Sequence, residues 1–204
     1  MSDIYELMIA VDLRDEISEQ ELAELSWHLG TGPQPERLSI VTEFPVVVVD
    51  DSGVPEIEDD PYPLLAGDGT AWRVGGVLCS ALTRRADLPW KGWSLTSRQE
   101  IHPDEFEKVG ELLCWLAARA HETHQLGDSA VGIGSLRFYE DEAPDALQVK
   151  SRAGQLADLK IGEEPPPSRR APGGSAQKRQ TTPRTPAWLA QQTFVVFADG
   201  GDLA

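Results

Sequence analysis

The chain has 204 residues, 40% of them hydrophobic and six of them tryptophan, which is enough for one domain with a sizeable core and appendages. Its formal net charge of −16 disfavours binding to nucleic acid or to an anionic membrane. No apolar run approaches the roughly 18 residues of a membrane-spanning helix, and the N-terminus lacks a signal-peptide pattern, so we expect a cytoplasmic protein.

The charge is distributed unevenly along the chain. Residues 1–162 hold 13 Lys and Arg against 30 Asp and Glu, and 13 − 30 gives −17. Residues 165–190 hold no acid and five basic residues: Arg169, Arg170, Lys178, Arg179 and Arg184. The acidic body either favours a basic protein partner or serves only solubility, and the basic stretch alone would bind nucleic acid weakly.

The N-terminal segment predicts a strand followed by a capped helix. Residues 4–13 alternate between two sets of side chains, as in a strand with one buried face. Ser18 and Glu21 have the spacing of a capping box, and Gly30 is a suitable terminator. We therefore expect a helix between Ser18 and Gly30.

Residues 31–69 read as an insertion that carries a small hairpin or an irregular cover. Residues 38–41 and 46–49 have the β-branched composition of short strands. An Asp-Asp-Ser-Gly turn leads from the second of these into residues 54–57. Residues 58–63 are acidic and proline-rich, which predicts a loop.

The second half predicts a long helix and four more strands. The helix begins at Pro103, runs to about Gln125 and carries an apolar stripe along one face. Gly75 and Gly76 predict a bulge in the strand that contains them. The expected strands span residues 71–84, 93–101, 133–140 and, as a short edge strand, 146–150.

This order of elements predicts an α+β fold: a ferredoxin-like antiparallel sheet with two helices on one face and an inserted hairpin region. The domain would span residues 1–158. Residues 159–186, rich in Pro, Gly and Arg, predict a disordered linker. Residues 187–204 form a short apolar C-terminal segment, a possible docking motif.

No catalytic motif is present: neither a nucleophile elbow, a phosphate loop nor a zinc-protease pattern. His121 and His124 lie one helical turn apart but lack a third ligand, so a structural role is favoured over a metal site. Cys79 and Cys114 lie in apolar runs and are expected as buried thiols. We predict no catalytic residue, no metal and no cofactor.

Two regions are candidates for contact with a ligand or partner. Strand alternation places Arg73, Arg98 and Arg137, with Tyr139, on the sheet face opposite the helices. These arginines could grip a carboxylate or phosphate, or form cross-strand salt bridges, and this face could also pair with a second copy. The second region is the C-terminal segment, which either docks on a partner or folds back as an edge strand. Its docking residues would be Trp188, Leu189, Phe194, Val195, Val196 and Phe197.

Together these features favour a non-enzymatic acidic interaction module, an adaptor or stoichiometric inhibitor with a tethered docking segment. The alternative is a dimeric α+β domain that binds a small molecule, or a cofactor-free enzyme, with a pocket between helices and sheet. Four aromatic residues would line that pocket: Trp27, Trp93, Phe106 and Trp115.

Overall fold

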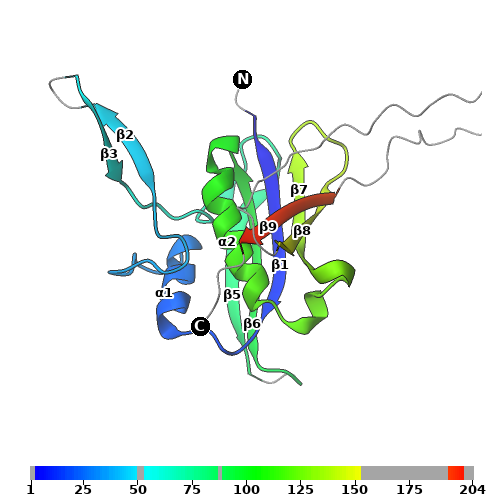
Figure 1. Cartoon of the computed structure of the whole chain (residues 1–204). Coiled ribbons are helices and arrows are strands. Elements are labelled where there is room, and N and C mark those ends of the chain that lie inside the picture. The colour runs from blue at the N-terminus through cyan, green and yellow to red at the C-terminus, as the bar shows by residue number, and fades with distance from the viewer. Residues whose placement is uncertain (1–2, 50–52, 87–88, 153–192, 200–204) are drawn as a thin grey trace, which may run out of the picture.

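A seven-stranded sheet with two α-helices beside it forms the body of the protein in a computed structural model that describes residues 3–49, 53–86, 89–152 and 193–199 (Figure 1). The helices are α1 (Glu19–His28) and α2 (Phe106–Arg119). The strands of this sheet are β1 (Tyr5–Leu13), β4 (Gly69–Thr70), β5 (Val77–Arg85), β6 (Gly92–Ile101), β7 (Ala130–Phe138), β8 (Asp145–Arg152) and β9 (Thr193–Asp199). A separate two-stranded sheet pairs β2 (Pro45–Val49) with β3 (Pro55–Asp59).

The strand order of the large sheet is β4-β5-β6-β1-β7-β8-β9. Neighbouring strands are antiparallel except β8 and β9, which run parallel. The sequence therefore predicted an α+β fold correctly but too narrow a sheet. In particular, β8 is not an edge strand, because residues 193–199 pair along it.

One face of β1 supplies the centre of the core. Leu7, Ile9, Val11 and Leu13 are all buried, as the alternating pattern predicted. They pack in one cluster with residues of both helices, such as Leu25 of α1 and Leu116 of α2, and with the inner faces of β6, β7 and β8. No helix of the described residues lies on the opposite face of the sheet, which is called the open face below (Figure 1).

Local capping signals fixed the start and end of α1. The Ser18 side chain accepts a hydrogen bond from the Glu21 N–H, and the Glu21 carboxylate accepts one from the Ser18 N–H, which confirms the capping box. After His28 the chain leaves the helix, and Gly30 adopts a φ of 70°, a conformation that favours glycine.

Helix α2 is shorter than predicted, since it ends at Arg119 instead of continuing to about Gln125. Ala120 is buried and extended, and it bridges Leu13 at the end of β1. The Arg14 N–H donates to the Arg119 carbonyl and the His121 N–H to the Asp12 carbonyl. The end of β1 thus captures the chain and stops the helix, a tertiary contact that apolar periodicity does not encode.

Two predicted strands are also wrong in whole or in part. Residues 38–41 form no strand, because Glu24 of α1 binds the backbone N–H groups of residues 39–41 instead. The strand expected at residues 71–84 starts only at Val77. Gly75 and Gly76 both have a φ of 72°, and the Ala71 N–H donates to the Gly76 carbonyl, so residues 71–76 form a turn between β4 and β5.

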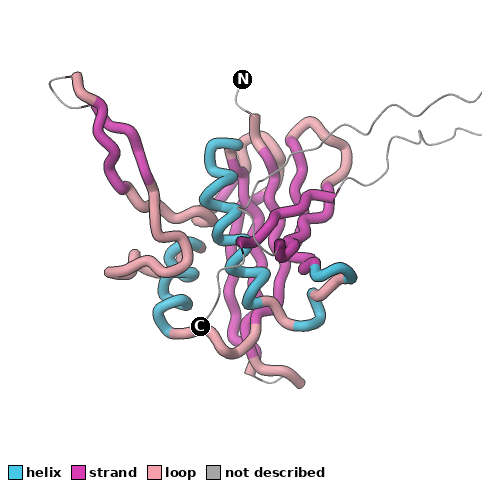
Figure 2. The backbone as a smooth tube through the Cα atoms, viewed as in Figure 1, coloured by secondary structure: helices cyan, strands magenta, loops and turns pink. Residues whose placement is uncertain are grey.

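The two-stranded sheet projects away from the body (Figures 1 and 2). Loops alone join it to α1 on one side and to β4 on the other, as Figure 2 shows. We call β2 and β3 together the arm. No helix in the described part of the chain is long and apolar enough to span a membrane.

Candidate interaction surfaces

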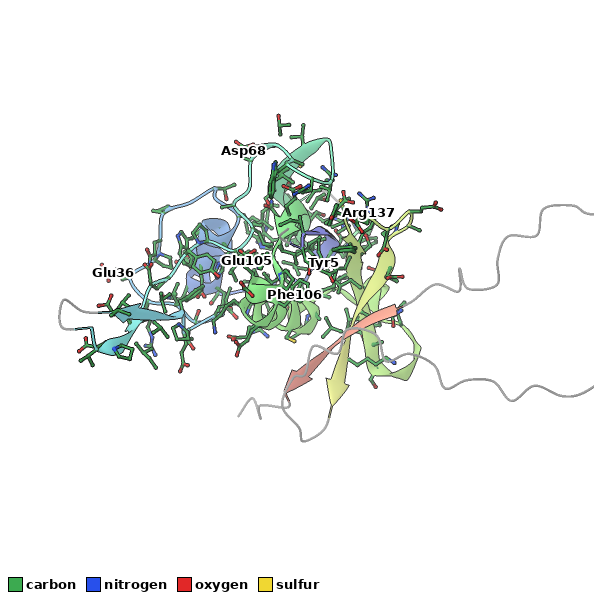
Figure 3. The ribbon with its side chains drawn as sticks, turned by 90° about the horizontal axis from the view of Figure 1, so that it is seen from above. Tyr5, Glu36, Asp68, Glu105, Phe106 and Arg137 are labelled. Carbon is green, nitrogen blue, oxygen red and sulfur yellow. The ribbon has the colours of Figure 1, made fainter. Side chains whose placement is uncertain are left out.

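The open face brings together the arginines that the sequence singled out, with a carboxylate between them. Glu6 of β1 pairs directly with Arg137 of β7, and Arg98 of β6 lies diagonally across from it, opposite Met8. The Arg98 Nε donates to Glu6 Oε1 over 2.7 Å, and the Arg137 Nε donates to Glu6 Oε2 over 2.8 Å. Figure 3 shows Arg137 across Tyr5 from Phe106, hence on the side of the sheet away from α2.

Glu6 therefore occupies the position that an external carboxylate or phosphate would take. Arg98 also donates to the carbonyls of Gly75 and Val77, and Arg137 donates to that of Asp141. The geometry is that of cross-strand ion pairs, in which backbone carbonyls also hold both guanidinium groups. Such pairs lower the exposed charge of the face and leave no vacant anion grip at these two residues.

Arg73 lies near the same end of the sheet, but it belongs to the turn between β4 and β5 and not to a strand. Its guanidinium lies 4.4 Å from the ring centre of Trp72 and 5.5 Å from that of Tyr139. Arg73 and Trp72 both lie in the turn before β5, and 69% of the surface of Trp72 is exposed. Strand alternation thus failed here because residue 73 is not in a strand.

Glu100 of β6 holds this turn against the sheet. Its carboxylate accepts hydrogen bonds from the N–H groups of Trp72 (2.8 Å), Arg73 and Val74 (2.9 Å). Partial burial acts to raise the pKa of Glu100, but these three backbone donors and nearby Arg98 outweigh it and lower that pKa. The ionised carboxylate of Glu100 therefore stabilises the turn.

The C-terminal segment is placed only in part. Phe194, Val195, Val196 and Phe197 belong to β9, which runs parallel to β8 with Leu147 opposite Phe194. The described part of this segment therefore folds back onto the body as an edge strand. Trp188 and Leu189 lie outside the described residues, as does the predicted linker.

The four aromatic residues that were expected to line a pocket between the helices and the sheet lie in or against the hydrophobic core. Trp27 and Phe106 are buried in the hydrophobic core, and Trp93 and Trp115 pack against it. A cavity of about 430 Å³ lies elsewhere, at the end of β1, and is lined mainly by charged side chains with Trp90 stacked on His121. Another, of about 400 Å³, adjoins residues 37–39.

His121 and His124, which follow the end of α2, have structural roles. His121 Nδ1 accepts from the Thr123 N–H, and His124 Nε2 accepts from the Asp12 N–H. Within the described residues, no group of three or more His, Cys, Asp or Glu side chains is arranged to hold a metal ion. Cys79 differs from its prediction, since it is exposed on the open face rather than buried.

The arm is the most prominent surface that sequence reasoning did not single out. The segment that leads into it, residues 39–44, is called its first root, and a buried carboxylate anchors this segment to the body. Glu24 of α1 is fully buried. Its Oε1 accepts from the N–H groups of Ile40 (2.8 Å) and Val41 (3.0 Å), and its Oε2 accepts from the N–H and the hydroxyl of Ser39. Phe44, immediately before β2, is buried in the core.

The segment that leads out of the arm, residues 64–67, is called its second root. His28, one turn after Glu24, supports this segment. It is fully buried, and burial lowers its pKa to about 4 even though Glu24 acts in the opposite direction. The neutral ring accepts a weak hydrogen bond at Nδ1 from the Leu64 N–H, and the His28 carbonyl accepts one from the Leu65 N–H (2.8 Å). Both leucines are buried.

A polar cluster on the inner face of β5 and β6 completes this root. The Ser80 hydroxyl donates to the Leu65 carbonyl (2.8 Å), and the Gln99 amide donates to the Gly67 carbonyl (3.2 Å). The segments on both sides of the arm are therefore fixed to the body by buried contacts. The arm itself is the part between them that the body does not cover.

One face of the arm is apolar and exposed. The register pairs Val47 with Ile57 and Val49 with Pro55, so these side chains lie on one side. Val47 and Val49 are each 67% exposed and Ile57 is 76% exposed. An isolated two-stranded sheet is marginally stable in water at best, and apolar faces of this kind mark sites of protein contact.

The other face and the surroundings of the arm are acidic. Glu56 and Glu58 alternate with the apolar residues of β3. The sequence from residue 38 to residue 72 has no Lys or Arg and eight acids: Glu43, Asp50, Asp51, Glu56, Glu58, Asp59, Asp60 and Asp68. The four consecutive valines predicted a strand, but nothing local in the sequence tells whether another element covers it.

Comparisons of this chain with protein-family models, with curated proteins and with solved structures find no match.

Proposed function

We propose that this protein is a non-enzymatic interaction module that contacts a protein partner through the arm. The single observation that carries the proposal is the exposed apolar face of Val47, Val49 and Ile57 on a hairpin that the body anchors but does not cover. A protein surface of this composition is stabilised when a partner removes it from water.

The body serves as the scaffold in this proposal. The order β7-β1-β6-β5, with α1 and α2 in the crossover connections, supports a ferredoxin-like core that β4, β8 and β9 extend. The C-terminal segment is assigned a smaller part than the sequence suggested, because β9 already has β8 as a neighbour. The working location that we propose is the cytoplasm.

The part of the open face around Arg73 provides a second, weaker surface for the same function. Trp72, Arg73 and Tyr139 are of the residue types that dominate binding energy in protein interfaces. Met8 and Val77 are also exposed. A second copy that pairs through this face would therefore be compatible with the arm contacting a different protein.

Site-specific photo-cross-linking of the full chain in its native cells tests the proposal. A photoreactive residue replaces Ile57 on the arm, and a matched variant carries it in place of Glu142, which is exposed away from the arm. We expect adducts with a defined protein from position 57 and none of the same mass from position 142. Identical adduct patterns from the two positions would refute the arm as the docking element.

A further inference from the structure

The two outer edges of the arm differ in how well they are protected. Each strand of a two-stranded sheet has one free edge, whose unpaired N–H and C=O groups can bind another strand. The sequence of β3, Pro-Glu-Ile-Glu-Asp, carries the charges and the proline with which natural edges block such pairing. β2 also begins with a proline, Pro45, but its other four residues are valines and carry no charge. The free edge of β2 is therefore the one open to strand addition.

A strand added beside β2 would meet two different environments on alternate side chains. Side chains on one face would lie next to Val47 and Val49, with Ile57 beyond them. Side chains on the other face would lie next to Val46 and Val48, with Glu58 and Glu56 one strand further. Strands lie about 4.8 Å apart, so long basic side chains can reach those carboxylates across the valines.

From this alternation we infer that the free edge of β2 accepts a partner strand in which apolar and basic residues alternate. The inference rests on the proposed function and specifies its partner. The apolar residues would lie beside Val47 and Val49 on the same face and contact them laterally, and Lys or Arg residues would pair with Glu56 and Glu58.

The charge of the arm decides between a foreign partner and the arm of a second copy. Two arms brought together would place their acidic residues close to one another, since residues 38–72 contain eight acids and no Lys or Arg. Like charges across a strand pair are destabilising. A basic strand removes this repulsion and gains electrostatic attraction as it approaches.

Peptide binding to the full chain, measured by fluorescence anisotropy, tests the inference. The probe is a labelled eight-residue peptide that alternates Lys and Val. One comparison peptide replaces every Lys by Glu, and another keeps Lys and Val but has N-methyl groups on alternate backbone amides, which blocks strand pairing. We expect the Lys/Val peptide to bind, more weakly at higher salt, and the other two to bind at least about tenfold more weakly.

A charge-reversed arm provides the matched protein variant. In Glu56→Lys/Glu58→Lys, both changed residues are exposed, so we expect the fold to be unaffected. We expect this variant to lose about tenfold in affinity for the Lys/Val peptide and to prefer the Glu/Val peptide. The control, Glu16→Lys/Glu142→Lys, changes the net charge equally at exposed sites away from the arm and should bind like the unmodified chain.

Several results would overturn the inference. Equal binding of the N-methylated peptide would show that no strand is added, and unchanged affinity in the charge-reversed arm would exclude pairing with Glu56 and Glu58. Tighter binding of a peptide with the sequence of residues 165–190, which is basic without alternation, would also contradict it. So would a dimer in sedimentation that Val47→Lys dissociates. Arm cross-links without any peptide binding would refute this inference alone, whereas absence of arm cross-links would refute the proposed function.

Discussion

Replacing Glu24 by glutamine should weaken the protein far more than an ordinary helix substitution. The Glu24 carboxylate is fully buried and accepts four hydrogen bonds from Ser39, Ile40 and Val41. Glutamine has nearly the same shape but only one acceptor oxygen, and its NH2 group is a donor. If the oxygen keeps the Ile40 and Val41 bonds, the NH2 group faces the Ser39 N–H, which loses its acceptor.

The magnitude follows from these contacts. A buried donor without a partner costs about 1–3 kcal/mol, and hydrogen bonds to a charged group are worth more than those to a neutral one. We therefore expect Glu24→Gln to lower the free energy of unfolding by about 3 kcal/mol. The loss should be concentrated at the first root of the arm, so amide hydrogen exchange at residues 39–41 should accelerate before that of β1.

Denaturant unfolding of the full chain, followed by tryptophan fluorescence, measures the effect. Glu19→Gln is the control, because Glu19 lies on the exposed side of the same helix and its replacement should change stability by less than about 0.5 kcal/mol. A Glu24→Gln variant as stable as this control, with unchanged exchange at residues 39–41, would refute the role of the carboxylate as the anchor.

Three further predictions concern the core, the open face and pH. Leu113→Ala should cost about 3 kcal/mol in denaturant unfolding, because the side chain is only 4% exposed; a loss below about 1 kcal/mol would contradict its core position. Glu6→Gln should leave Arg98 and Arg137 with less negative charge between them, so inorganic phosphate should perturb their side-chain NMR signals in this variant and not in the unmodified chain. The pKa of His28 falls from 6.5 to about 4 on folding, so the unfolded chain binds the proton more readily and stability decreases as pH falls from above 6.5 towards 4. That loss amounts to about 3 kcal/mol, and urea unfolding between pH 7 and pH 4 should show a shallower decline in His28→Gln.

The sequence by itself determined those features that neighbouring residues decide. The alternation in residues 5–13 identified β1 and its buried face. The Ser18–Glu21 box and Gly30 located both ends of α1, since the atoms involved lie within a few residues of one another. The hairpin of β2 and β3 was also predictable, from a turn sequence between two short β-branched runs.

Tertiary structure decided which surfaces are covered. Four valines in a row are equally compatible with a buried strand and with the exposed β2, because coverage depends on elements distant in sequence. The end of α2 at Arg119 depends on the backbone of β1, about 100 residues earlier. Arg98 and Arg137 form ion pairs and not an anion-binding site, because both side chains donate to Glu6, which is opposite Arg137 and diagonal to Arg98 in the sheet. Local patterns specify the elements, and long-range packing specifies what each element leaves free for a partner.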